Sequence, residues 1–194
     1  MVPKEYYGRL FTKEQLPVDY HSEAFTLESM IKVDKQLRCK RCYSQIEEDW
    51  QLPEGQYYCR ACIVFGRNQE GNELYYFPSK TSEIEFPVLK WLGELTPYQA
   101  EVSEKLLETY QKQKDSLVHA VTGAGKTEMI YNIVAYVLEN KGHVAIASPR
   151  VDVCRELFLR MKRDFTCSIS LLHAESEPYD GSPLVIATTH QLLK

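Results

Sequence analysis

The sequence predicts an α/β protein with a parallel sheet, preceded by a small zinc-binding module. Three observations predict this class. Apolar runs alternate with amphipathic helical patterns in the second half of the chain, as expected when helices connect parallel strands and cover both faces of the sheet. A glycine-rich turn joins one such run to a helix, and two C-x-x-C pairs lie further upstream. The predicted parts are an N-terminal region at 1–75 that holds the zinc module at about 36–66, a linker at 76–94, and the α/β part at 95–194.

Composition narrows the class of protein. The chain has 194 residues, of which 44% are hydrophobic and 26% are charged, which is typical of a soluble globular protein. Its 23 basic and 27 acidic residues give a net charge of −4, so a nucleic-acid site would have to be local. The N-terminus lacks the apolar core of a signal peptide, and no run approaches the roughly 18 apolar residues of a membrane span. We therefore expect a cytosolic protein with reduced thiols.

The N-terminal 35 residues are weakly patterned. Four apolar side chains near the start are expected to form a small cluster, and residues 74–77 to form a short strand. The clustered residues are Tyr6, Tyr7, Leu10 and Phe11.

Four of the six cysteines form two C-x-x-C pairs separated by 16 residues. This spacing predicts a four-thiolate zinc site at Cys39, Cys42, Cys59 and Cys62. A reducing compartment disfavours two disulfides, and the presence of two pairs disfavours a redox dithiol. Four thiolates leave no open coordination position, so the zinc should be structural and not catalytic. The segment 49–59 predicts a hairpin that delivers the second pair.

Cations and aromatic residues alternate around these cysteines. Such a pattern suits single-stranded nucleic acid, because cations follow the phosphates while aromatic rings stack on bases. The same cations could instead offset the negative charge of a zinc tetrathiolate, and the sequence leaves both interpretations open. The residues are Arg38, Lys40, Arg41 and Arg60 with Tyr43, Tyr57 and Tyr58.

A helix is predicted to begin after Thr96. Thr96 as N-cap, Pro97 at the first helical position and Gln99 at the third form a capping box. Capping alone would account for Gln99.

The stretch 117–140 predicts a strand, a phosphate-binding loop and a helix. The apolar run 117–121 is expected to be a buried strand, followed by G-A-G-K-T and by apolar residues at helical spacing. Glycines allow backbone N–H groups to turn toward a phosphate at a helix N-terminus. Lys126 would place its charge on the phosphates, and Thr127 would join the Mg²⁺ shell. Alanine stands at position 120, where the strict pattern has glycine.

The loop sequence allows two other interpretations. One is a strand-to-helix turn with a surface lysine. The other is a dinucleotide fold, which is disfavoured because the loop lacks a third small residue and the next strand ends without an acid for the ribose. Beyond the loop, the elements expected are strands at 143–147, 169–172 and 184–188, a helix at 151–164 and the start of a helix at 189–194.

The motifs L-T-P-Y-Q, A-V-T-G-A-G-K-T-E, A-S-P-R and A-T-T-H-Q-L-L resemble the first motifs of superfamily 2 helicases, in which alanine often opens the phosphate loop. Within that superfamily, the chain is most similar to the competence ATPases of DNA uptake in transformable Gram-positive bacteria. This similarity includes the H-A-E-S-E-P run and a four-cysteine module ahead of the motor, and it extends from about residue 36 onward.

The resemblance implies a RecA-like lobe that binds ATP with Mg²⁺. Gln99 would contact the adenine edge, with Trp91 or Tyr98 nearby, and Lys126 and Thr127 would be catalytic. Ligands of parallel sheets bind beyond the C-terminal ends of the strands, which agrees with the implied DNA contacts. The implied nucleotide-binding residues are Gln99, Thr122, Gly123, Ala124, Gly125, Lys126, Thr127 and Glu128. The implied DNA-binding residues are Ser148, Pro149, Arg150, Thr188, Thr189 and His190.

The implied function is an ATP-driven translocase of single-stranded DNA that acts in the cytoplasm at the inner face of the cell membrane, with other competence proteins as partners. We expect this chain to be an N-terminal fragment that ends before the Walker B acid, so that it hydrolyses ATP poorly by itself. An exposed sheet edge would favour homo-oligomers. Two alternatives are a zinc-dependent binding module with a non-catalytic lobe, and a nucleotide kinase, for which neither a lid nor an acceptor acid is evident.

Overall fold

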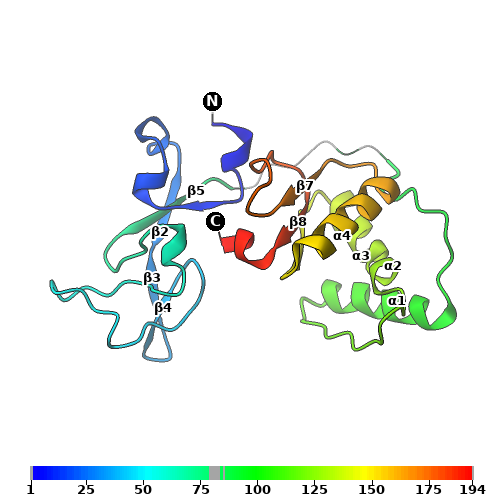
Figure 1. Cartoon of the computed structure of the whole chain (residues 1–194), viewed down its shortest axis with the longest axis horizontal. Coiled ribbons are helices and arrows are strands. Elements are labelled where there is room, and N and C mark those ends of the chain that lie inside the picture. The colour runs from blue at the N-terminus through cyan, green and yellow to red at the C-terminus, as the bar shows by residue number, and fades with distance from the viewer. Residues whose placement is uncertain (1, 79–83, 85, 194) are drawn as a thin grey trace. The chain divides into compact units, whose positions relative to one another are not determined.

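The computed structural model describes residues 2–78, 84 and 86–193, and the chain divides into two units (Figure 1). The first unit comprises residues 1–80 together with 189–194, and the second comprises residues 81–188. No helix among the described residues is both long enough and apolar enough to cross a bilayer.

The first unit combines a small antiparallel sheet with a hairpin. The sheet has the strand order β1-β5-β2, and β3 pairs with β4 in the hairpin. The strands are β1 (Leu10–Phe11), β2 (Phe25–Glu28), β3 (Met30–Val33), β4 (Gln36–Cys39) and β5 (Glu73–Tyr76), and the 3-10 helices are η1 (Lys4–Tyr6), η2 (Lys13–Gln15), η3 (Val18–Tyr20), η4 (Ile63–Phe65) and η5 (Thr189–Leu193).

The predicted N-terminal apolar cluster is confirmed for Tyr6, Tyr7 and Phe11 but not for Leu10. The ring of Tyr6 lies 5.2 Å from that of Phe11 and 6.2 Å from that of Phe77. Phe11 and Phe77 are buried. The predicted strand at 74–77 corresponds to β5, which lies between β1 and β2 and gives the unit its central strand.

The second unit is a three-stranded parallel sheet covered by helices. The strand order is β6-β8-β7, with Val144 of β6 and Ile169 of β7 both opposite Leu184 of β8. The predicted strands and the helix between them are confirmed to within one residue. The elements are α1 (Pro97–Gln111), α2 (Lys126–Met129), α3 (Tyr131–Glu139), β6 (Val144–Ser148), α4 (Val151–Asp164), β7 (Ile169–Leu172) and β8 (Leu184–Thr188).

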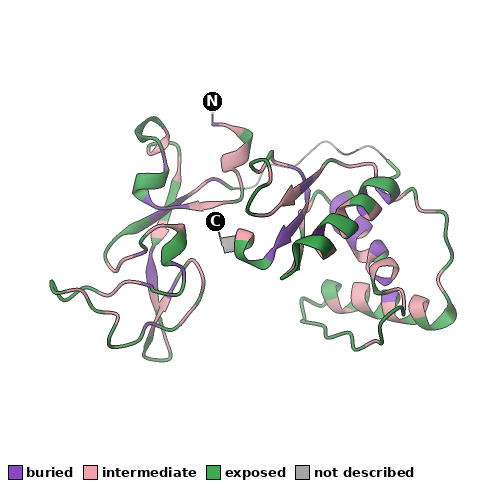
Figure 2. Ribbon diagram, in the orientation of Figure 1, coloured by how far each residue is buried: buried purple, intermediate pink, exposed green. Residues whose placement is uncertain are grey.

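The core of the second unit lies between the sheet and the helices α3 and α4. Its buried side chains gather on α3 and β8 (Figure 2). The fully buried members include Tyr131, Leu138, Met161, Phe165 and Ile186. The central strand β8 packs against α4, α3 packs against β6, and the apolar side chains of these elements share one core.

The expectation of helices on both faces of the sheet is wrong for the described residues. Helices α3 and α4 share one core, and the hydroxyl of Tyr131 on α3 donates to Asp164 at the end of α4. Ala145 and Ala147, which alternate with the core-facing residues of β6, are exposed. The cause is the connection between β7 and β8, because residues 173–183 form no helix that could cover the second face.

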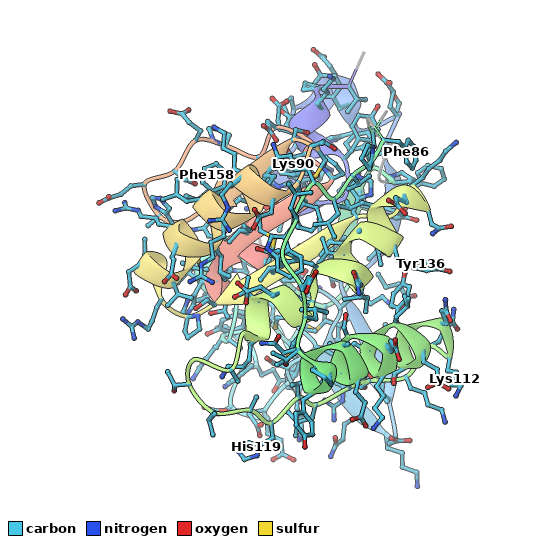
Figure 3. All side chains as sticks on the ribbon, turned by 90° about the vertical axis from the view of Figure 1, so that its right-hand side faces the viewer. Phe86, Lys90, Lys112, His119, Tyr136 and Phe158 are labelled. Atoms are coloured by element: carbon cyan, nitrogen blue, oxygen red, sulfur yellow. The ribbon has the colours of Figure 1, made fainter. Side chains whose placement is uncertain are left out.

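The strand predicted at 117–121 is also contradicted. The segment is irregular, and Leu117 and Val121 are 95% and 78% exposed. Figure 3 places His119 on a loop near α1, with which this segment lines a hollow of about 400 Å³. An apolar run becomes a strand only when a neighbouring strand satisfies its backbone groups, and no described residue pairs with this one.

Two further boundaries differ from the predictions. The helix after the phosphate loop is interrupted at Ile130, which separates α2 from α3. The predicted linker also contributes to the second unit. Val88 is fully buried, and its carbonyl accepts a hydrogen bond from the Thr166 amide over 2.9 Å. Residues 79–83 and 85 of that linker lie outside the described part of the chain.

Candidate zinc centre and phosphate-binding loop

The four cysteines predicted to bind zinc converge on one point. Their sulfur atoms all lie within 4.8 Å of one another, and three of the four residues are buried. The Cys39 and Cys62 sulfurs are 3.7 Å apart, and those of Cys42 and Cys59 are 3.5 Å apart. A tetrahedral zinc tetrathiolate with Zn–S bonds of about 2.3 Å has sulfur–sulfur edges of roughly 3.8 Å. The residues present therefore fit a structural Zn²⁺.

Each pair is carried by a turn with its own backbone hydrogen bonds. In the first turn, the Tyr43 amide donates to the Cys39 carbonyl over 2.8 Å, and the Cys39 amide donates to the Ser44 carbonyl over 3.0 Å. In the second, the Cys59 amide donates to the Asn68 carbonyl over 2.9 Å. These bonds fix the backbone of each turn, so that both turns direct their thiols toward one point.

The predicted hairpin before the second turn is confirmed. The Tyr58 amide donates to the Trp50 carbonyl over 3.1 Å, and the Leu52 amide to the Gln56 carbonyl over 2.8 Å. Gly55 closes the turn with a φ of 90°, a left-handed conformation that favours glycine.

Two side chains donate hydrogen bonds to the cysteine sulfurs. The Arg41 guanidinium donates to the Cys62 sulfur through Nη2 (3.1 Å) and Nε (3.3 Å), and also to the carbonyls of Phe65 and Gly66. Asn68, which is 1% exposed, donates from Nδ2 to the Cys39 sulfur over 3.1 Å. Such donors orient the ligands and stabilise thiolate charge. For Arg41, the structure favours charge compensation over nucleic-acid contact.

The thiols perturb one another because they are so close. Hydrogen bonds from Cys59 and then Cys62 hold the pKa of Cys39 far below its usual range, and the bond to Cys39 raises the pKa of Cys59. The same partner, Cys39, raises the pKa of Cys62 to about 11. The Cys39 sulfur thus readily carries a negative charge, while Cys59 and Cys62 need a cation nearby before they lose their protons.

Two arginine side chains at the surface of the zinc module lie over tyrosine rings. Arg38 lies over the Tyr43 ring at 5.2 Å, and Arg60 lies over the Tyr58 ring at 5.7 Å. Arg60 also forms an ion pair with Asp49 over 3.1 Å. These pairs are at the surface of the unit, so both interpretations of this pattern stay open for Arg38 and Arg60.

The predicted phosphate loop has the backbone shape that its glycines suggested. Gly123 and Gly125 adopt left-handed φ values of 81° and 75°, and Gly125 is the N-cap of α2. The left-handed φ favours glycine at position 125, and a Cβ there would also displace the end of the Gln99 side chain. The Ala124 amide donates to the Val121 carbonyl over 3.3 Å, which closes the bend. Thr122 is exposed and Thr127 half-buried on either side.

Lys126 is exposed and lies against the loop. Its ammonium group donates to the carbonyls of Ala120 (2.9 Å) and Val121 (2.7 Å). A cation is therefore held at the mouth of the bend, where the charge of a phosphate group would be neutralised. The loop fits ATP through its left-handed glycines and this lysine, and Thr127 is the hydroxyl available to Mg²⁺.

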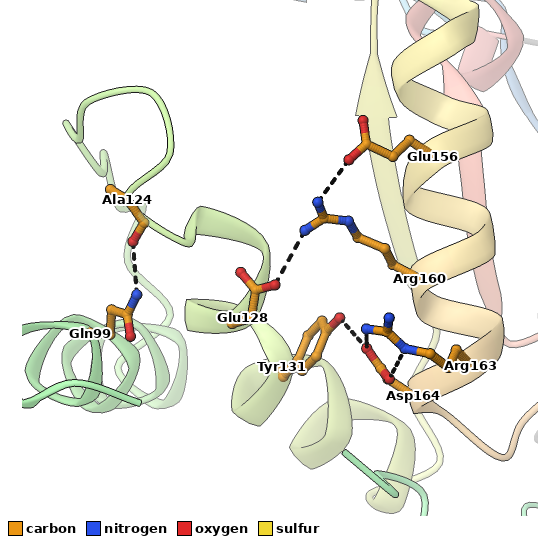
Figure 4. Close-up of polar contacts among 8 residues, drawn as sticks. All are labelled: Gln99, Ala124, Glu128, Tyr131, Glu156, Arg160, Arg163 and Asp164. Atoms are coloured by element: carbon orange, nitrogen blue, oxygen red, sulfur yellow. Dashed lines mark hydrogen bonds and ion pairs between the residues drawn. The ribbon is translucent and has the colours of Figure 1, made fainter. Parts of the chain in front are cut away.

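Two side chains hold the loop from opposite sides, as Figure 4 shows for Gln99 and Arg160. Gln99 completes the predicted capping box of α1 by accepting from the Thr96 amide, and its Nε2 donates to the Ala124 carbonyl over 3.0 Å. Arg160 donates to Glu128 over 3.2 Å. Of the aromatic residues expected near adenine, Trp91 packs edge-on against Tyr131, and Tyr98 is 82% exposed.

The residues expected to contact DNA lie at the C-terminal edge of the sheet. Ser148 and Thr188 are opposite each other in the parallel pairing of β6 and β8. Pro149 and Arg150 follow β6, and Arg150 pairs with Asp152. Thr189 and His190 follow β8 directly and are exposed.

Several contributing residues carried no sequence signal. Nothing in their local pattern identified Asn68 as a donor to Cys39 or Arg160 as a partner of Glu128, because both contacts span about 30 residues. The buried bond between Tyr131 and Asp164 (2.6 Å) was missed for the same reason. These residues are identified only by their contacts with distant segments of the chain, and a single sequence does not show such contacts.

Comparison with known proteins identifies one protein family and two relatives that bear the same name. Residues 92–194 match the family model described as "Type III restriction enzyme, res subunit". The chain is 54% identical over 193 residues to "Competence protein ComFA" of Streptococcus pneumoniae (strain ATCC BAA-255 / R6), covering 98% of this chain and 44% of that protein. It is 34% identical over 192 residues to the protein of that name from Bacillus subtilis (strain 168), covering 95% of this chain and 42% of that one. The chain thus spans less than half the length of these relatives. No solved structure matches.

Proposed function

Because this chain belongs to the family described as "Type III restriction enzyme, res subunit", we propose that the full-length protein is an ATP-dependent motor that moves single-stranded DNA during DNA uptake in natural transformation. The two relatives named as competence proteins support the biological setting. The observation that carries the proposal is the loop at Gly123–Thr127, with its left-handed glycines and the exposed ammonium of Lys126.

In this proposal the chain supplies three of the motor's parts. Gln99 and residues 122–128 bind ATP, with Lys126 neutralising phosphate charge and Thr127 completing the Mg²⁺ shell. The strand ends at 148–150 and 188–190 contact the DNA backbone at the sheet edge. The four cysteines hold a structural zinc that folds the first unit. Other competence proteins are proposed partners, and the chain alone is proposed to hydrolyse ATP poorly.

The test compares the full-length wild type with Lys126→Ala and a control, Lys112→Ala. Lys112 lies at the end of α1 (Figure 3), and its ammonium group pairs with Glu108 one helical turn away. ATP turnover is measured with and without a single-stranded oligonucleotide. We expect the oligonucleotide to stimulate wild type and Lys112→Ala, and Lys126→Ala to lose turnover by roughly a hundredfold or more, because the loop lysine stabilises phosphoryl charge.

The oligonucleotide should still bind to Lys126→Ala, because the proposed DNA contacts lie on other strands. Turnover that is indifferent to DNA would contradict the motor and favour a kinase. An absence of turnover in wild type would favour a zinc-dependent binding module, for which the arginine–tyrosine pairs on the first unit would be the contact surface.

A further inference from the structure

An ion pair between Glu128 and Arg160 links α2 to α4 (Figure 4). The two residues are 32 positions apart, and the nitrogen–oxygen distance is 3.2 Å. Glu128 is on the first turn of α2, two residues after Lys126 and one after Thr127. Its side chain is 24% exposed and that of Arg160 is 40% exposed, so solvent screens this pair less than a fully exposed pair.

Arg160 makes a second ion pair with Glu156 over 2.8 Å, within α4 itself. The planar guanidinium has several N–H donors in a fixed geometry, so one arginine can hold two carboxylates at once. Glu156 accepts from Nη2 of the guanidinium, and Glu128 accepts from Nη1. The two pairs differ in what they connect, since only the Glu128 pair joins two elements of the fold.

Helix α4 also connects the loop to the proposed DNA edge. It begins at Val151, directly after Arg150, and it packs across all three strands of the sheet. On its other side the loop is held by Gln99 of α1, while α2 has only four residues and the segment before the loop pairs with no strand in the described chain. A movement of α4 would therefore reach Lys126 and Thr127 through Arg160.

We propose that Arg160 is a positioning residue for the phosphate loop: its bridge to Glu128 holds α2 in the geometry that binds ATP and links that geometry to α4. The coupling to DNA rests on the proposed function, whereas the effect on nucleotide binding does not. Arg160 does not touch the nucleotide; it acts through Glu128.

The experiment measures binding of a fluorescent ATP analogue with Mg²⁺ to the full-length protein, alongside ATP turnover with and without a single-stranded oligonucleotide. The variants are Arg160→Gln, Glu128→Gln and their combination, with Glu156→Gln as the matched control and Arg160→Lys as the conservative change. We expect each of the first two to weaken analogue binding about three- to tenfold, the range that corresponds to loss of a partly screened ion pair. We expect the same variants to reduce stimulation by the oligonucleotide.

The double variant should be no weaker than the weaker single one, because both changes remove the same interaction. Glu156→Gln should bind the analogue as wild type does, and Arg160→Lys should retain most of the affinity. A merely structural role would lower the melting temperature of Arg160→Gln while leaving its analogue affinity at the wild-type value, and that result would overturn the proposal. Effects of the two single changes that multiply, or an equal effect of Glu156→Gln, would also overturn it.

The outcomes separate this inference from the proposed function. If wild type binds the analogue but shows no DNA-stimulated turnover, the motor fails while Arg160 is still judged by the binding constants of the variants. If DNA stimulates turnover and Arg160→Gln behaves as wild type in both assays, the motor stands and the role of Arg160 fails. If wild type binds no analogue, both are overturned.

Discussion

The zinc centre and the phosphate loop differ in the range of the contacts that shape them. The sulfurs of Cys39 and Cys59 are oriented by turns whose backbone hydrogen bonds close within about ten residues. The phosphate loop is instead held by Gln99, which lies 25 positions before Ala124, and by Arg160, 32 positions after Glu128. The comparison indicates that each turn of the first site is built locally and that Arg41, Asn68 and the metal join the turns, whereas the second site depends on contacts between separate helices.

The largest effect should come from removing a zinc ligand. Cys59→Ser leaves three thiolates, and we expect the first unit to lose its metal and with it folding free energy on the order of 10 kcal/mol. Cys167→Ser makes the same chemical change at a half-buried cysteine outside the cluster and should retain the zinc. Metal content is measured by atomic absorption for both variants and wild type.

The two tryptophans allow the units to be followed separately. Trp50 packs against the cysteine cluster, and Trp91 packs on Tyr131 in the second unit. In a Trp91→Phe background, the fluorescence of Trp50 should report unfolding of Cys59→Ser. In a Trp50→Phe background, Trp91 should report an unchanged second unit. If Cys59→Ser retains its zinc, the four-cysteine site is contradicted. If the fluorescence of both tryptophans changes, the two units do not unfold independently.

A smaller effect should follow from one buried hydrogen bond of the second unit. Tyr131 is 1% exposed, and its hydroxyl donates to Asp164 over 2.6 Å. Burial, and then the Asp164 carboxylate, raise the pKa of Tyr131, so the hydroxyl stays protonated as the donor. Tyr131→Phe should cost about 1–3 kcal/mol of unfolding free energy, because the hydrogen bond is to a charged group.

The matched control is Tyr136→Phe, since Tyr136 is on the same helix and its hydroxyl makes no hydrogen bond with a described residue. Urea unfolding followed by Trp91 should show a shifted midpoint for Tyr131→Phe and wild-type behaviour for Tyr136→Phe. Equal shifts of the midpoint in the two variants would mean that the hydrogen bond to Asp164 does not stabilise the unit, and that removal of any hydroxyl has the same effect.

The same contrast explains how much could be predicted from the sequence. The C-x-x-C spacing predicted the zinc cluster, and the turn at Gly55 predicted the hairpin, because both are determined by residues near one another in the chain. Capping by Thr96 and the bounds of α4 were predicted for the same reason. Local patterns thus identified the elements and the candidate ligands.

The errors concern contacts between distant segments. The run at 117–121 has strand composition, but its state depends on a partner strand that composition does not reveal. Helices were predicted on both faces of the sheet, but the described chain between β7 and β8 forms no helix and leaves one face without one. Arg160 was missed because its only signal is spatial proximity to Glu128.

The smallest effect expected is the response of the second unit to acid. The Arg163 guanidinium, bonded to both oxygens of Asp164, holds the pKa of that carboxyl below its usual range, against the opposing effect of burial and with help from the Tyr131 hydroxyl. Because the folded-state pKa is lower than the unfolded one, the charged carboxylate stabilises the fold above the unfolded pKa. This contribution is lost as the pH falls through the folded-state pKa.

Asp164→Asn should therefore remove part of the acid sensitivity of the second unit. Arg163 is 67% exposed, so solvent screens the pair, and we expect the stability gap between wild type and Asp164→Asn to shrink by less than about 1 kcal/mol between pH 6 and pH 3. Urea unfolding of the Trp50→Phe protein at both pH values measures this gap. A gap that is constant or widens on acidification would mean that the carboxyl has no lowered pKa in the folded unit. If the stability gap shrinks by well over about 1 kcal/mol, the ion pair between Arg163 and Asp164 is stronger than the exposure of Arg163 suggests.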